Sequence, residues 1–206
     1  MAVTGGSGNP EREDVPDDVI KRTLPFMSLV IATMVQIQWL TGMRPSELCR
    51  MTFGSIYRTD DLWYYDLEFH KTQEYIGKKT IPLGKPEQKL LLPFLENKKG
   101  TDALFSPRMT KKNEFYTSQS YRTAVERAIQ KGNKVLPDNE KIPHWTPYQL
   151  RHATATVIEL EDGLDAAQAQ LGHKTANMTK RYSKAQLKTR EKLARNRKNP
   201  FDESNS

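Results

Sequence analysis

A stretch without any charged residue, at positions 26–43, constrains the fold of this chain more than any other feature. The stretch is long enough to suggest a membrane-spanning helix, and it ends directly before Arg44. It nevertheless contains five polar uncharged side chains, Ser28, Thr33, Gln36, Gln38 and Thr41. Such a mixture is more typical of a helix buried in a protein core. We therefore expect a folded domain organised around this helix, and no membrane partner.

The flanking patterns predict a mainly α-helical fold with a small antiparallel β-hairpin or sheet. The first helix is expected over 17–41, with a break at Pro25 and an end at Gly42. Pro45 suits the first turn of the next helix, 45–53. Further helices are expected at 86–97, 117–131, 147–161, 164–171, 175–182 and 184–196.

Two segments after the second helix have the composition of β-strands. The aromatic-rich residues 62–69 predict one strand, and residues 79–83 predict its return partner after a turn around 72–77. Pro82 lacks a main-chain N–H, so we expect it at the edge of the sheet. The other turn signals predict helix ends at Gly132 and Gly163, and loops at 111–114 and 131–141.

The length of 206 residues is sufficient for one domain with a substantial core. We expect a disordered segment, linker or tag remnant at 1–16, the folded domain at 17–198, and a disordered tail at 199–206. Cys49 is the only cysteine, which excludes an internal disulfide and a cysteine-based zinc site. Residues 1–15 lack the apolar segment of a secretory signal, so we expect a reducing, cytoplasmic location.

The charge distribution favours a polyanionic partner. Lysine and arginine number 32 against 25 aspartates and glutamates, a net charge of +7. The positive charge is concentrated in residues 184–198, whereas residues 11–18 are acidic. Nucleic acid is the first candidate partner, and the alternative is an ordinary soluble surface that happens to be basic.

The first motif that carries chemistry is Thr41-Gly-Met-Arg-Pro-Ser-Glu-Leu48. Arg44 falls between a helix-ending glycine and a proline that starts the next helix. Its guanidinium fork can donate two hydrogen bonds to phosphate oxygens, and Glu47 could hold the fork in place. The alternative is an ordinary surface arginine–glutamate pair on a helix.

The second motif is His70-Lys71-Thr72, at the end of the aromatic strand. A lysine at a hairpin tip can donate a proton to a leaving oxygen, which makes Lys71 a candidate general acid. The alternative is a solvated turn lysine. Lys78 and Lys79 lie in the same hairpin, so the choice of lysine stays open.

The remaining motifs lie later in the chain. Tyr148 and Arg151 are three residues apart, so they share one face of a helix, whereas His152 points elsewhere. His173, in Leu-Gly-His, precedes Tyr182 by nine residues. A phenol beside imidazole and guanidinium groups can attack a phosphodiester. The alternatives are an amphipathic helix with a salt-bridged arginine, a helix-capping histidine and a half-buried core tyrosine.

The order and spacing of these motifs resemble the tyrosine recombinase (phage integrase-type) family, from about residue 20 to residue 190. The resemblance implies the catalytic-domain fold of that family over 17–198. It also implies that two arginines clamp the scissile phosphate, a lysine protonates the leaving 5′-oxygen, a histidine contacts a phosphate oxygen and a tyrosine forms a 3′-phosphotyrosyl link. By this resemblance, Arg44 and Arg151 correspond to the two arginines, with Glu47 supporting Arg44, and Lys71 corresponds to the lysine. His173 corresponds to the histidine and Tyr182 to the tyrosine.

The resemblance further implies site-specific recombination or integration of double-stranded DNA, as carried by mobile elements. The expected assembly is a homo-tetramer on synapsed DNA, associated with the nucleoid and completed by an N-terminal DNA-clamp domain that is separate from or missing from this chain. No metal, ATP or other cofactor is expected. The basic residues 184–198 are expected either to dock on a neighbouring protomer or to contact solvent or DNA.

One position departs from the family pattern. Tyr148 stands where a histidine is usual, three residues before the second arginine. A phenol is protonated at neutral pH, so it can donate a hydrogen bond to a phosphate oxygen but cannot accept a proton as imidazole does. His144 is a possible substitute. The alternatives to a recombinase are therefore a catalytically impaired DNA-binding module of the same fold and a type IB topoisomerase.

Overall fold

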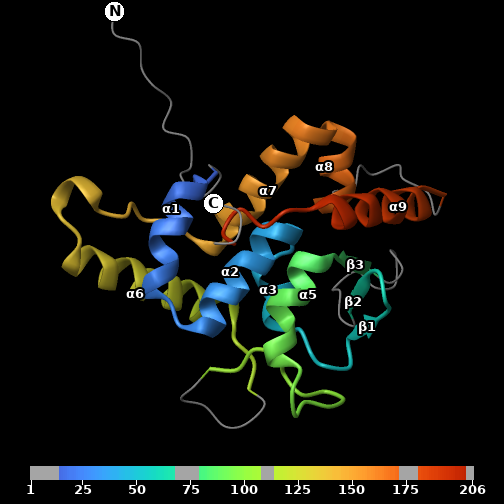
Figure 1. The fold of residues 1–206 in the computed structure, drawn as a ribbon, viewed down its shortest axis with the longest axis horizontal. Helices are drawn as coiled ribbons and strands as arrows, with labels where there is room; N and C mark the ends of the chain where they lie inside the picture. Colours follow the sequence, from blue (N-terminus) through green and yellow to red (C-terminus); the bar gives the residue numbers. More distant parts are fainter. Residues whose placement is uncertain (1–13, 68–78, 108–113, 172–180, 203–206) are drawn as a thin grey trace, which may run out of the picture.

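The computed structural model describes residues 14–67, 79–107, 114–171 and 181–202, without the side chains of 181–184. The described chain is mainly helical and contains one three-stranded antiparallel sheet, which confirms the predicted fold class (Figure 1). In the described part of the chain, no helix has the length and apolar character needed to span a membrane.

The uncharged stretch forms the central helix α2 (Leu29–Thr41). The predicted break at Pro25 is present, because α1 (Asp17–Thr23) is followed by the 3₁₀ turn η2 (Leu24–Phe26). The Ser28 hydroxyl caps α2 by accepting a hydrogen bond from the Ile31 N–H at 3.4 Å. Gly42 ends the helix with φ of +63°, a left-handed conformation that favours glycine.

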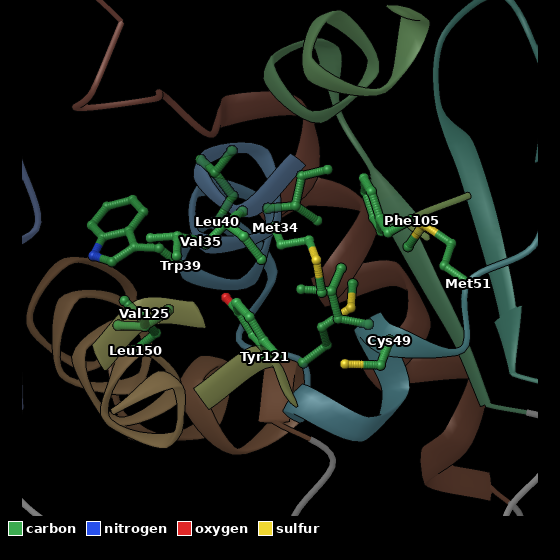
Figure 2. Packing of buried hydrophobic residues seen from close by; sticks show 14 of the residues in the cluster. Met34, Val35, Trp39, Leu40, Cys49, Met51, Phe105, Tyr121, Val125 and Leu150 are labelled. Carbon is green, nitrogen blue, oxygen red and sulfur yellow. The ribbon is translucent and has the colours of Figure 1, made fainter. Parts of the chain in front are cut away.

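Helix α2 is buried because the other helices pack around it. Their boundaries are α3 (Pro45–Cys49), α5 (Lys85–Leu91), η3 (Leu92–Phe94), α6 (Ser118–Val135), η4 (Asp138–Glu140), α7 (Pro147–Asp162), α8 (Leu164–Leu171) and α9 (Arg181–Asn196). Figure 2 shows the core that α2, α3, α6 and α7 share, with Met34, Val35, Leu40, Cys49, Tyr121, Val125 and Leu150. Burying a side chain of this size contributes about 1.5–3 kcal/mol. Burial also raises the pKa of Cys49 to about 12, so the thiol is an inert core group.

The sheet has the order β1–β2–β3, with β1 (Ile56–Arg58), β2 (Trp63–Leu67) and β3 (Lys79–Leu83). Pro82 lies on β3, which is an edge strand among the described strands, as predicted. Strand β1 is absent from the sequence prediction because three residues are too few to show an alternating pattern.

Several predicted boundaries were wrong. The second helix ends at Cys49 rather than at residue 53. Helix α6 continues through Gly132 to Val135, so the first half of the expected 131–141 loop is helical. Gly132 permits close packing, since a Cβ there would lie 2.7 Å from the Phe26 ring. Gly163 does end α7. Residues 111–113 of the other expected loop and residues 175–180 of an expected helix lie outside the described residues.

The expected disordered ends were also partly wrong. Val15 is buried in the core, although it falls within the expected 1–16 segment. After α9 the chain returns to α2 (Figure 1), where the Phe201 ring packs edge-on against Trp39 at 5.3 Å between centroids. The Asn199 amide donates a hydrogen bond to Gln36 Oε1 at 2.8 Å. Residues 199–202 are therefore packed, because they bury apolar and polar groups against α2.

Candidate active site

The helix junction at Gly42 positions Arg44 as the sequence predicts. Arg44 is the N-cap residue of α3, and Glu47 reaches back from the first turn of that helix. Glu47 Oε2 accepts a hydrogen bond from the Arg44 main-chain N–H at 2.8 Å, and Glu47 Oε1 accepts one from Arg44 Nη1 at 3.0 Å. Glu47 is 6% exposed, whereas the Arg44 side chain is 41% exposed. The carboxylate thus fixes one edge of a guanidinium that still faces outward.

Lys79, the first residue of β3, joins the same carboxylate. Its Nζ donates to Glu47 Oε1 at 2.7 Å, and its side chain is largely buried. Burial would raise the pKa of the Glu47 carboxyl, but Lys79 and Arg44 together hold that pKa below its ordinary value. Burial lowers the pKa of Lys79 to about 8, with Glu47 opposing the shift. The site therefore contains one stabilised anion between two cations.

Arg151 completes this cluster from α7. Its side chain is 3% exposed; Nη1 donates to the Gly42 carbonyl at 2.5 Å and Nη2 to the Leu171 carbonyl at 2.8 Å. These bonds join the last residues of α2 and α8 to the first turns of α7. Burial, and then the nearby Arg44 charge, lower the pKa of Arg151 to about 10, so the guanidinium stays charged at neutral pH. Cations outnumber carboxylates in this cluster, which suits a bound anion such as phosphate.

Tyr148 lies one helical turn before Arg151 and is 47% exposed. Its ring contacts the His152 ring at 5.7 Å between centroids, so the expectation that His152 points elsewhere was wrong: residues four apart lie on the same helix face. His144 lies 3.7 Å from the Glu126 carboxylate of α6. That contact directs the imidazole toward α6, which weakens the case for His144 as a substitute for the expected histidine.

Three of the expected site residues cannot be placed by their side chains. Lys71 and His173 lie outside the described residues. Tyr182 belongs by its main chain to the first turn of α9, and its side chain also lies outside the description. The described residues thus include the expected phosphate clamp and the main chain of the helix that carries the expected nucleophile.

Helix α9 is attached to the cluster by Arg190, which is 8% exposed. Arg190 Nε donates to the Ala169 carbonyl of α8 at 2.6 Å, and Nη1 donates to the Thr80 carbonyl of β3 at 3.2 Å. Thr80 follows Lys79 directly in the chain, and Ala169 lies two residues before Leu171. Arg190 therefore links the helix of Tyr182 to both elements that border the cluster.

The basic segment 184–198 packs on its own domain, an arrangement that neither of the two expectations included. Leu193 and Ala194 are buried, and Gly84 lies so close that a Cβ there would meet the Ala194 carbonyl oxygen at 1.9 Å. The Arg197 guanidinium forms an ion pair with Glu87, which is fully buried in α5. The segment is held in place by packing and by ion pairs within the chain.

The sequence left open which lysine of the hairpin belongs to the site, and it did not indicate a role for Arg190. Lys79 is 32 residues from Glu47 in the chain, and only the pairing of β3 brings the two together. The signal available was that Lys78 and Lys79 shared the hairpin with Lys71. In the described ranges, no group of three or more His, Cys, Asp or Glu side chains has a metal-binding arrangement.

Comparisons with known proteins identify the family of this chain. A family model described as the phage integrase family matches residues 17–188. Tyrosine recombinase XerC of Corynebacterium efficiens is 28% identical over 163 residues, covering 74% of this chain and 45% of that protein. Tyrosine recombinase XerD of Halalkalibacterium halodurans is 30% identical over 169 residues, covering 77% and 50%. The chain spans about half the length of these curated relatives.

Solved structures share the fold. The Tn1549 transposon integrase in complex with circular intermediate DNA has a TM-score of 0.62 at 18% identity, covering 90% of this chain and 67% of that chain. A lambda integrase dimer bound to a COC′ core site has a TM-score of 0.60 at 20% identity, covering 85% and 63%. These similarities support the mainly helical fold with its small sheet.

Proposed function

The chain belongs to the phage integrase family, and from that premise we propose that it is the catalytic domain of a site-specific recombinase that cuts and rejoins double-stranded DNA. The observation that carries the proposal is the cluster in which Arg44 and Lys79 bind the Glu47 carboxylate and buried Arg151 lies within electrostatic reach of Arg44 and Glu47. Its excess of positive charge lies beside the helix that contains Tyr182.

The proposed reaction starts with attack of the Tyr182 phenol oxygen on the scissile phosphorus. The new P–O(Tyr) bond forms as the P–O5′ bond breaks, which leaves a 3′-phosphotyrosyl link and a free 5′-hydroxyl. Tyr182 releases its proton to solvent water, and Lys71 gives a proton to the leaving 5′-oxygen. A 5′-hydroxyl of another strand then reverses these steps, and the covalent link preserves the phosphodiester energy without ATP.

Arg44 and Arg151 stabilise the transition state in this proposal. Charge builds up on the non-bridging oxygens as phosphorus becomes five-coordinate, and cations held in advance stabilise it more than the ground state. His173 contributes a further hydrogen bond to one of these oxygens. Arg151 is held in advance by two main-chain carbonyls, so its charge does not have to reorganise during the reaction.

Tyr148 separates the leading proposal from the catalytically impaired DNA-binding module. The residue is half-exposed, and a phenol hydroxyl can donate a hydrogen bond to phosphate. If this hydrogen bond replaces the usual histidine, Tyr148→His leaves the cleavage rate within about threefold, while loss of such a donor costs about 10²–10³ in rate. A rate increase of that size in Tyr148→His would instead favour the impaired module.

We extend the proposal to the partners. Lambda integrase is known as a tetramer bound to a Holliday junction, and a homo-tetramer on synapsed DNA is the corresponding assembly for this chain. We also propose that an N-terminal DNA-clamp domain takes part in binding DNA, because the chain spans about half the length of its curated relatives.

The test is covalent capture of DNA. The probe is a duplex selected from a random pool by this chain, with a nick that lets the short cleaved strand diffuse away. We expect a detergent-resistant adduct with the wild-type chain, while Tyr182→Phe binds the same duplex and forms none. A chain that binds the duplex tightly and never forms an adduct would contradict the proposal.

A further inference from the structure

The Glu47 carboxylate receives hydrogen bonds from three different donors. Its Oε2 accepts from the Arg44 main-chain N–H, and its Oε1 accepts from both Arg44 Nη1 and Lys79 Nζ. The Glu47 main-chain carbonyl accepts from the Tyr65 hydroxyl of β2 at 2.7 Å. Glu47 is therefore the point at which the sheet is tied to the junction that contains Arg44.

Arg44 depends on this connection. Its side chain is 41% exposed, and among the described residues Glu47 is the carboxylate that it contacts. A long, half-exposed side chain has many rotamers, so a fixed anion is needed to select one of them. Lys79 binds the same Oε1 at the shorter distance, which keeps the carboxylate in place and leaves the Arg44–Glu47–Lys79 group with net positive charge.

We propose that Lys79 is a positioning residue of the active site: it holds the Glu47 carboxylate, which in turn fixes the Arg44 guanidinium for the scissile phosphate. This inference rests on the proposed function. It is distinct from proton donation to the leaving oxygen, because the Lys79 Nζ is bound to Glu47 and its side chain is 13% exposed. That step remains with Lys71 in the proposed reaction.

The first test compares Lys79→Met, which removes the charge, with Lys79→Arg, which keeps it. On the selected nicked duplex, we expect Lys79→Met to slow adduct formation about 10- to 100-fold, because small misplacements of a catalytic group have effects of this size. Lys79→Arg should stay within about threefold of wild type. Lys85→Met is the matched control, since Lys85 is exposed and donates to the Asp60 carbonyl away from the cluster.

A second substrate separates positioning from proton donation. In a duplex with sulfur in place of the bridging 5′-oxygen, the leaving thiolate needs no proton. Lys71→Ala should then recover its rate, whereas Lys79→Met should stay as slow as on the oxygen substrate. Recovery of Lys79→Met on the sulfur substrate would overturn the inference, and so would a rate equal to wild type on the oxygen substrate.

The pH profile provides a third readout. The charged groups around Lys79 in the described chain are Glu47 and Arg44 at α3, Arg151 on α7, and Arg190 on α9 beside Thr80. Burial lowers the pKa of Lys79 to about 8, so above that pH the amine loses the charge that holds Glu47. Wild-type cleavage should fall through this range, and Lys79→Arg should retain its rate to higher pH. Identical profiles would count against the inference.

A readout without cleavage distinguishes failure of the inference from failure of the proposed function. The Arg44 Nε–H signal in nitrogen NMR, assigned with Arg44→Lys, should be sharp in wild type and Lys79→Arg and broadened in Lys79→Met. If the wild-type chain forms no adduct but this pattern holds, the proposed function fails while the ordering of Arg44 by Lys79 stands. An unchanged Arg44 signal in Lys79→Met overturns that ordering.

Discussion

The junction that holds the arginines and the helix that carries Tyr182 are attached to the fold in different ways. At the junction, Gly42 and Arg151 lie in the core, and the contacts are buried hydrogen bonds to main-chain carbonyls. Helix α9 lies on the outside of the domain (Figure 1), and it is held by Arg190, the Arg197–Glu87 pair and close packing on Gly84. The Arg151 part of the phosphate clamp should therefore be lost only with the whole fold, whereas α9 should be able to detach alone.

The largest expected effect is at the buried ion pair of α9. Arg197→Met leaves the Glu87 carboxylate buried without its partner, which costs about 3–5 kcal/mol. We expect hydrogen exchange to show loss of protection in α9 while α2 stays protected. Arg197→Met combined with Glu87→Gln should regain much of the stability. Equal loss of protection in α2 and α9 would show that the two regions unfold together.

The second effect concerns the stability of the cluster as a function of pH. The pKa of Lys79 falls from an ordinary 10.5 to about 8 on folding, so between these values the unfolded chain binds more protons. The contribution of Lys79 to stability therefore rises from pH 8 to 10.5, by on the order of 3 kcal/mol, even as cleavage falls. The measurement is urea unfolding of wild type against Lys79→Met, which cancels the titration of other groups. If the stability difference between wild type and Lys79→Met did not change with pH, the lowered pKa of Lys79 would be contradicted.

A matched pair of glycines compares the two regions directly. Gly42→Ala places a side chain at φ of +63° and 3.0 Å from the Leu171 methyl Cδ2, which should lower global stability by about 1–3 kcal/mol. Gly84→Ala drives a Cβ into the Ala194 carbonyl, so it should shift α9 and slow cleavage with less effect on global unfolding. Thermal unfolding and adduct formation together measure both. A larger loss of global stability in Gly84→Ala than in Gly42→Ala would contradict the proposed difference between the two regions.

The smallest expected effect is at the exposed ion pair of α9. Arg195 Nε lies 2.8 Å from the Asp61 carboxylate, and both side chains are about half exposed or more. Arg195→Ala should lower stability only slightly, since exposed pairs contribute little. The check is urea unfolding at low and high salt. A loss as large as that of Arg197→Met would mean that exposed charges, rather than the buried pair, hold α9.

The difference between contacts within a few residues and contacts between distant segments explains what the sequence could predict. Local signals predicted α2, its end at Gly42 and the Arg44–Glu47 pair, because these depend on residues only a few positions apart. The contacts of Lys79 with Glu47 and of Arg190 with Thr80 join distant segments, which no local pattern encodes. The roles of Lys71, His173 and Tyr182 remain predictions, because their side chains lie outside the described residues.

The most direct test of the proposed function is the identity of the residue that becomes linked to DNA. The adduct formed on the nicked duplex can be digested with trypsin and nuclease, and the modified peptide can be sequenced by mass spectrometry. We expect a nucleotide attached through a 3′-phosphate to Tyr182, and no such peptide from Arg151→Ala. A nucleotide attached to any other residue, or DNA bound without any linked peptide, would contradict it.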